Sequence, residues 1–235
     1  MLQLPPAVLG ALTGCRRDGT RTGGSMFALY TFGDSILDCG RYNEHGVHPG
    51  QLLVRNDDRL FPGLRGQDLS THGQARLEHR ARDGATVDGL PSQARGLRVD
   101  GPGAAILTVG GNDLLRGLIV DTGPGMAAFA AAVDAFVREL PVRPVFIGNV
   151  YDPSGGNDAN NFLGIDPRIA RTNHRRLNMV LAEIAARYGT LADLHAHFLT
   201  GDLSWFTSTI EPSMRGASGV RRVFLPLVLG AQRGA

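Results

Sequence analysis

The sequence predicts an α/β fold with a mostly parallel sheet, because short apolar runs alternate with longer helical patterns along the chain. Residues 104–109 and 145–150 are continuous apolar runs, which is typical of parallel strands that are covered on both faces. Residues 126–140 form an alanine-rich helical pattern that ends before a proline. Residues 167–188 begin with proline and are followed by Gly189, as the start and stop signals of a helix require.

The remaining elements are expected between these four. Strands are expected at residues 27–32, 74–82 and 191–197. Shorter helices are expected at 87–97 and 114–119, a short helix or turn at 36–42, and a closing helix at 215–229. Residues 43–73 are polar and rich in glycine, proline and arginine, so they predict a long excursion with a few helical turns.

Length, charge and composition limit the function. A chain of 235 residues fits one α/β domain or two small ones, and its net charge of +2 is too small to indicate nucleic acid or an anionic membrane as a partner. All 24 basic residues are arginine, which excludes P-loop, Schiff-base, PLP and Ser–Lys chemistry, because each requires a lysine. The two cysteines are too few for a disulfide scaffold or a zinc cluster. No apolar run approaches the roughly 20 residues of a membrane span.

The first 25 residues differ in character from the rest. The stretch Leu12-Thr13-Gly14-Cys15 resembles a lipoprotein cleavage box, but no basic residue precedes its short apolar patch. We therefore expect residues 1–25 to be a disordered or wrongly assigned extension and residues 26–235 to form the domain. A cytoplasmic location is favoured, and the box leaves export open as the alternative.

Three of the expected strands lead into turns that carry glycine and polar side chains. They are Gly33-Asp34-Ser35, the turn at Gly84, and Gly110-Gly111-Asn112-Asp113. In a parallel sheet these turns reach the same edge, where ligands bind. Ser35 is the candidate nucleophile, and its own N–H, the N–H of Gly84 and the side-chain amide of Asn112 are candidate donors to an oxyanion.

In their order and combination these three turns resemble the SGNH (GDSL) hydrolase family of esterases and lipases. The resemblance covers most of residues 26–229. It implies a three-layer α/β/α sandwich with a flavodoxin-like sheet and hydrolysis of small-molecule esters through a serine, with no metal or organic cofactor. It implies nothing about the oligomeric state.

One block departs from the family pattern. The family's last block is Asp-x-x-His, and the equivalent place here is Ser208-Thr209-Ile210-Glu211, which puts Glu211 where the base should be. A glutamate with an ordinary pKa near ~4.3 is a weaker base than an imidazole, and burial would have to raise that pKa. The alternative is that Glu211 pairs with one of three arginines, Arg215, Arg221 or Arg222, which would lower its pKa.

A histidine from elsewhere could replace the missing base. His195 and His197 fall at the end of the last expected strand, on one face of it, and Asp193 or Asp202 could orient one of them. His45 and His48, in the loop after the nucleophile, are further candidates. The alternative is that His195 and His197 are structural residues bonded to backbone.

The sequence therefore predicts a serine hydrolase that cleaves a carboxylic ester, with Ser35, Gly84 and Asn112 at its site and Glu211 or His197 as base. The alternative is a catalytically silent domain of the same fold that binds a carbohydrate or a lipid. A third reading, a mononucleotide binder, lacks a phosphate loop with the Rossmann spacing.

Overall fold

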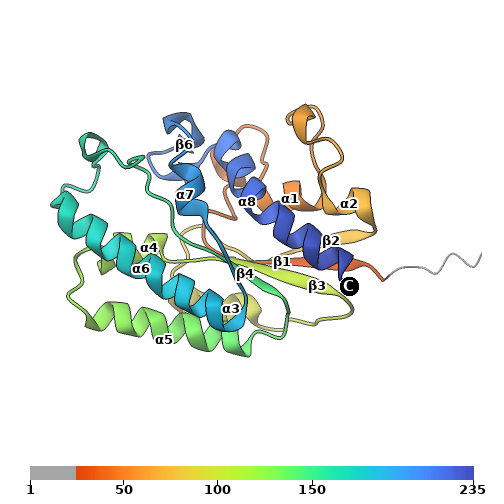
Figure 1. Ribbon diagram of the computed structural model, residues 1–235, viewed down its shortest axis with the longest axis horizontal. Helices are drawn as coiled ribbons and strands as arrows, with labels where there is room; N and C mark the ends of the chain where they lie inside the picture. The colour runs from red at the N-terminus through yellow and green to blue at the C-terminus, as the bar shows by residue number, and fades with distance from the viewer. Residues whose placement is uncertain (1–24) are drawn as a thin grey trace, which may run out of the picture.

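A computed structural model describes residues 25–235, and its centre is a five-stranded sheet (Figure 1). The strands are β1 (Phe27–Gly33), β2 (Ala75–His79), β3 (Gly103–Thr108), β4 (Val145–Gly148) and β5 (Thr190–Ala192). All neighbouring pairs are parallel and the order is β2-β1-β3-β4-β5, which is the flavodoxin-like order. The predicted parallel α/β fold is confirmed, while the expectation for Leu12–Cys15 lies outside the described residues.

Helices cover both faces of the sheet and complete the three layers. One face is covered by α3 (Leu90–Ala94), α5 (Pro124–Glu139) and α6 (Pro167–Tyr188), and the other by α1 (Pro49–Val54), α2 (Leu69–His72), α7 (Leu194–Phe198) and α8 (Met214–Arg233) (Figure 1). Alternation along β1 serves both layers: Tyr30 and Phe32 pack into the first core, and Leu29 into the second. Both faces of the sheet are therefore buried.

The last strand of the five-stranded sheet, β5, ends earlier than predicted. Residues 191–197 were expected as one strand, but β5 ends at Ala192. The Asp193 side chain accepts a hydrogen bond from the N–H of Ala196 and caps α7, which begins at Leu194. His195 and His197 therefore lie on a short helix, and the prediction that they share a face of a strand is wrong.

Short elements fill the connections. These are the 3₁₀ turns η1 (Gly40–Tyr42), η2 (Pro62–Leu64), η3 (Val87–Gly89), η4 (Leu118–Val120), η5 (Asp158–Asn160) and η6 (Leu203–Trp205), the helix α4 (Gly111–Leu115), and the ribbon β6 (Phe206–Thr207) with β7 (Glu211–Pro212). The helix expected at 87–97 is thus a 3₁₀ turn followed by five α-helical residues. Within residues 25–235, no helix combines the length and apolar character needed to cross a membrane.

A buried arginine holds the polar excursion between α1 and α2 against α8. Arg221 is fully buried, and its guanidinium donates to Asn56 Oδ1 (2.5 Å) and Ser218 Oγ (2.8 Å). It also lies over the ring of Phe61, 4.7 Å from the ring centroid. Burial lowers the pKa of Arg221 to about 10. This segment therefore packs as part of the domain, and α1, η2 and α2 are the helical turns that were predicted within it.

Candidate active site

Ser35 lies at the switch point of the sheet. The chain passes from β1 to β2 on one side of it and then crosses to β3 on the other side, and ligands of such sheets bind outside the carboxyl ends of the strands at the point where the strand order reverses. The turn after β1 is a single helical turn, in which Leu37 and Asp38 both donate to the carbonyl of Asp34 at 3.1 Å. Ser35 is 7% exposed and lines a cavity there.

Gly33 lets the turn that carries Ser35 lie close to β3. Its φ is +119°, and a Cβ at this position would lie 1.6 Å from the carbonyl oxygen of Thr108. The buried Gln93 side chain holds the same residue from both sides, accepting from the Gly33 N–H (2.7 Å) and donating to its carbonyl (2.8 Å). The backbone that presents Ser35 is therefore fixed by packing and by hydrogen bonds.

Asp34 anchors the turn from beneath. Its side chain is buried, and its Oδ1 accepts from the hydroxyl of Thr108 (2.8 Å) and the N–H of Ile36 (3.2 Å). Burial raises the pKa of Asp34 from 3.8 to about 7, and these two hydrogen bonds oppose the rise. Its contacts are those of a group that shapes the turn around Ser35.

The turns after β2 and β3 are tied to each other. Asn112, in the first turn of α4, donates through Nδ2 to the carbonyl of Ala85 at 3.0 Å, and the Asp113 carboxylate accepts from the N–H of Val87 at 3.1 Å. Gly84 lies in the same turn as Ala85, with φ +74°. Asn112 lines the cavity with Ser35, whereas Gly84 is not among the lining residues. The structure thus brings Ser35 and Asn112 to one cavity and places Gly84 in the turn bonded to Asn112.

Asp38 links the Ser35 turn to the Gly84 turn. Its Oδ2 accepts from the N–H of Asp83 at 2.9 Å, and its Oδ1 lies 3.2 Å from Nε2 of His79. His79 in turn meets the buried Thr31 hydroxyl at 2.7 Å through Nδ1. The residue directly before Gly84 is therefore held by a carboxylate from the Ser35 turn.

Glu211 reaches the same cavity from the β6–β7 ribbon. The turn between these strands has positive φ at Ser208 (46°) and Thr209 (75°), and the Tyr151 hydroxyl donates to the carbonyl of Ile210 at 2.7 Å. Glu211 is 8% exposed, its Oε2 is buried without a hydrogen-bond partner in the part of the chain that the structure describes, and the neighbouring Ser35 hydroxyl favours the ionised carboxylate and so lowers its pKa. The ribbon therefore brings a carboxylate directly to the Ser35 hydroxyl.

Burial raises the pKa of the Glu211 carboxyl above its usual 4.5. The Ser35 hydroxyl opposes that rise in the pKa, and the nearby charge of Asp83 adds to it. Among the described residues none of Arg215, Arg221 and Arg222 forms an ion pair with Glu211: Arg215 donates to Ser204 Oγ (3.2 Å) and Arg221 to Asn56. The arginine whose charge lowers the pKa of Glu211 is Arg41, and its effect is smaller than that of burial. Glu211 is thus a buried carboxyl with a raised pKa beside Ser35.

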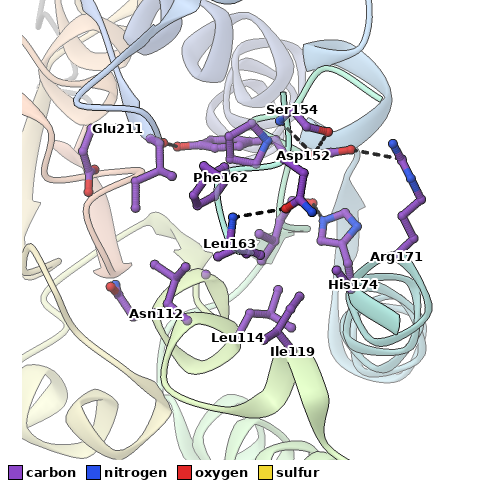
Figure 2. Close-up of a pocket in the computed structure, with 18 of the residues that line it drawn as sticks. Asn112, Leu114, Ile119, Asp152, Ser154, Phe162, Leu163, Arg171, His174 and Glu211 are labelled. Carbon is purple, nitrogen blue, oxygen red and sulfur yellow. Dashed lines mark hydrogen bonds and ion pairs between the residues drawn. The ribbon is translucent and has the colours of Figure 1, made fainter. Parts of the chain in front are cut away.

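The cavity has a volume of about 120 Å³. Figure 2 shows Glu211 and Asn112 at one end and Arg171 and His174 at the other, with the apolar side chains of Leu114, Ile119, Phe162 and Leu163 between them. It lies between α4 with η4, the 151–166 connection and α6. Within the described residues, no group of three or more His, Cys, Asp or Glu side chains gathers as metal ligands.

Comparison with protein families assigns the chain. A model of the GDSL-like lipase/acylhydrolase family matches residues 31–217, which is most of the sequence and includes Ser35, Gly84, Asn112 and Glu211. The chain belongs to this family. Lipases and acylhydrolases cleave esters, so membership of this family makes the protein an ester-hydrolysing enzyme. A comparison with curated protein sequences finds no match.

Solved structures of GDSL-type and related esterases share the fold. The acetylxylan esterase Axe2 of Geobacillus stearothermophilus is 19% identical, with a TM-score of 0.62 over 88% of this chain and 95% of its own. A lipolytic G-D-S-L protein of Veillonella parvula is 19% identical, with a TM-score of 0.58 over 86% and 98%. LAE5, an alpha/beta hydrolase from the metagenome of Lake Arreo, is 20% identical, with a TM-score of 0.59 over 88% and 94%. At these identities the likeness is one of fold.

The candidate histidines of this GDSL-family enzyme lie away from Ser35. His197 packs against Trp205, with ring centroids 5.2 Å apart, and burial lowers its pKa. His195 packs against His174 at 4.9 Å and donates its backbone N–H to Asn149 Oδ1 at 2.8 Å. Neither lines the cavity. The contacts of His197 therefore give no support to it as the base.

The other groups named as helpers are also engaged elsewhere. Asp193 caps α7 and accepts from Asn149 at 2.8 Å, and Asp202 caps η6 through the N–H of Ser204. His48 stacks on His79 with ring centroids 4.2 Å apart, and His45 pairs with Glu44 at 3.2 Å. None of these residues lines the cavity.

The sequence reasoning missed two groups that the GDSL-family fold places at the site. Tyr151 lines the cavity and supports the peptide before Glu211, and it follows β4 at the same sheet edge as the predicted turns. A strand-end argument applied to β4 could have found it. His174 lies within α6, where helical periodicity gives no signal of a cavity position.

Proposed function

We propose that the enzyme cleaves carboxylic esters through an acyl-enzyme on Ser35, with Glu211 as the general base. The Ser35 hydroxyl attacks the acyl carbon while its proton passes to the Glu211 carboxylate. The tetrahedral intermediate places its negative oxygen toward the N–H groups of Ser35 and Gly84 and the amide of Asn112. Its collapse breaks the ester bond, and protonated Glu211 returns the proton to the leaving alcohol.

The second half of the reaction reverses these roles. A water molecule gives a proton to Glu211 and attacks the acyl-enzyme, and the same donors hold the second oxyanion. The proton then returns to Ser35 as the free acid departs. In each step the proton moves between Glu211 and the oxygen of Ser35, of the leaving alcohol or of the attacking water. No third group is therefore needed for proton transfer.

One observation carries this proposal: a buried carboxylate lies beside the Ser35 side chain in a cavity that also contains Asn112. Its raised pKa makes Glu211 a stronger base than an exposed glutamate, although burial also raises the fraction that is protonated at low pH. A protein that only binds its ligand would have no need of a carboxylate in contact with the serine.

Steady-state hydrolysis of p-nitrophenyl butyrate tests the proposal. We expect Ser35→Ala to abolish turnover and Glu211→Gln to lower kcat by about 10²–10⁴-fold. Glu183→Gln, the same change at an exposed position on α6, is the matched control and should retain full activity. A decrease in His197→Gln with full activity in Glu211→Gln would move the base to His197. Absence of turnover in the wild type would leave the ligand-binding alternative.

A further inference from the structure

The wall of the cavity between its two ends is apolar. Figure 2 shows four of the side chains that form this wall, Leu114, Ile119, Phe162 and Leu163, which come from α4, η4 and the 151–166 connection. Ile36, in the turn after β1, and Ile210, the residue before Glu211, also line the cavity. Polar groups occur at the reactive end, which holds Ser35, Asn112 and Glu211, and at the far end. A ligand that extends from Ser35 therefore meets hydrocarbon first.

The polar side chains at the far end already have protein partners. Arg171 donates to Asp158 Oδ1 (2.8 Å from Nε), to Asp152 Oδ2 (3.3 Å) and to the carbonyl of Gly156 (2.8 Å). His174 Nε2 lies 2.8 Å from the carbonyl of Val150. A sugar ring carries a hydroxyl on nearly every carbon, and burying such groups without partners is costly. The far end therefore suits a hydrocarbon chain better than a sugar.

The other side of Glu211 is charged. Arg41 and Asp83 form an ion pair at 3.1 Å, Tyr42 donates to the same carboxylate at 2.9 Å, and both charges act on the pKa of Glu211. Arg41, Tyr42 and Asp83 do not line the apolar cavity. Since Glu211 must reach the leaving oxygen, this polar side is where the alcohol would lie, which leaves the cavity for the acyl group.

The volume of the cavity sets the length of that acyl group. An apolar cavity of roughly 150 Å³ holds a benzene ring, so a cavity of about 120 Å³ accepts a chain of about six carbons. An acetyl group would leave most of this space empty. We propose that the cavity binds the acyl group of the ester, and that the preferred substrates are esters of unbranched acids of about six carbons. This proposal rests on the proposed function of Ser35.

A chain-length series measures the preference. With the full-length protein and p-nitrophenyl esters, kcat/KM should rise about fourfold for each added methylene and on the order of 100-fold from acetate to hexanoate. It should fall again at decanoate, which exceeds the cavity. An acetate ester that is hydrolysed as fast as the hexanoate would overturn the proposal. So would a gain from lengthening the alcohol, in alkyl acetates, with no gain from lengthening the acid.

Two Ala→Leu variants on α6 test whether the preference for longer acyl groups arises in the cavity. Ala170 lines the far end of the cavity, and leucine is well tolerated in a helix, so Ala170→Leu should shorten the space for the chain. The ratio of hexanoate to acetate kcat/KM should fall at least about tenfold in this variant. Ala186→Leu is the matched control on the exposed face of the same helix and should keep the wild-type ratio. An unchanged ratio in a folded Ala170→Leu protein would contradict the assignment.

A binding measurement separates failure of this proposal from failure of the proposed function. If no ester is hydrolysed, the function of Ser35 fails, and calorimetric titration with 1-hexanol then tests the cavity alone. The wild type and Ala186→Leu should bind hexanol, and Ala170→Leu should bind at least about tenfold more weakly. Equal binding in all three proteins, or no binding in any, would overturn the acyl cavity.

Discussion

Replacing Asp34 by asparagine should make the protein more stable above neutral pH but not in acid. The buried carboxyl has a pKa of about 7 in the folded protein and 3.8 as its ordinary value. The folded state therefore binds the proton more tightly than the unfolded state. Stability contributed by the neutral carboxyl is present below pH 3.8 and is lost as the pH rises to about 7.

The size of this effect follows from the two pKa values. At about 1.4 kcal/mol for each pH unit, the interval between them amounts to roughly 4 kcal/mol. The amide in Asp34→Asn would keep an oxygen acceptor for the Thr108 hydroxyl and the Ile36 N–H, so the substitution removes the ionisation and retains both hydrogen bonds. The free-energy advantage of Asp34→Asn should therefore grow by roughly 4 kcal/mol between about pH 4 and about pH 8.

Urea denaturation of both proteins at the two pH values measures this difference of differences, in which the titration of other groups cancels. The same effect should appear as a relative rise of roughly 10 °C in Tm at the higher pH. An advantage that changes by less than about 1 kcal/mol between the two pH values would show that Asp34 does not titrate as its burial requires.

The contacts of three other side chains lead to further predictions. In pH–rate profiles, kcat/KM should rise as Glu211 loses its proton, with a midpoint above 4.5, and Glu211→Gln should lose that limb. Asp38→Ala should lower kcat about tenfold with little change in KM, because Asp38 positions the turn that carries Gly84, and a parallel rise in KM would argue against that role. Asn56→Ala removes one of the two hydrogen-bond acceptors of the buried Arg221 guanidinium, so it should lower the free energy of unfolding by about 1.5–3 kcal/mol in urea denaturation. An unchanged midpoint would show that this hydrogen bond contributes nothing to stability.

Much of the fold follows from local sequence patterns. The bounds of α6, Pro167–Tyr188, agree with the prediction because proline at its start and Gly189 at its end act within one turn of the helix. The apolar runs in β1, β3 and β4 predicted a parallel sheet because both of its faces are buried. These features depend on neighbours in sequence, so reasoning from sequence reaches them.

The strand predicted at β5 was too long because the apolar pattern gives no sign that a helix begins directly after the strand. Residues 191–197 alternate as a strand would, but the Asp193 side chain caps the following turn and starts a helix instead. A helix cap directly after a short strand outweighed five further residues of alternation, 193–197. If Asp193 is taken as a helix cap, and not as a partner for a histidine, the sequence predicts both the end of β5 and the structural role of Asp193 correctly.

Part of the site could likewise be predicted from the sequence, and part could not. Ser35, Asn112 and Glu211 could be placed together because strand ends of a parallel sheet converge, and Glu211 because it occupies a block of known position in the family. The far wall of the cavity could not be predicted. The course of the 151–166 connection depends on bonds from Arg171 to residues 13 and 19 positions earlier, and no local pattern encodes these bonds.

The rate at which a fluorophosphonate probe labels Ser35, followed by intact-protein and peptide mass spectrometry, tests most directly whether Glu211 activates that serine. The wild type should take up one label on the peptide that contains Ser35, and Ser35→Ala should take up none. Glu211→Gln should react about 10²–10⁴-fold more slowly while remaining folded. Equal labelling rates in the wild type and Glu211→Gln, or a label on another residue, would contradict the account.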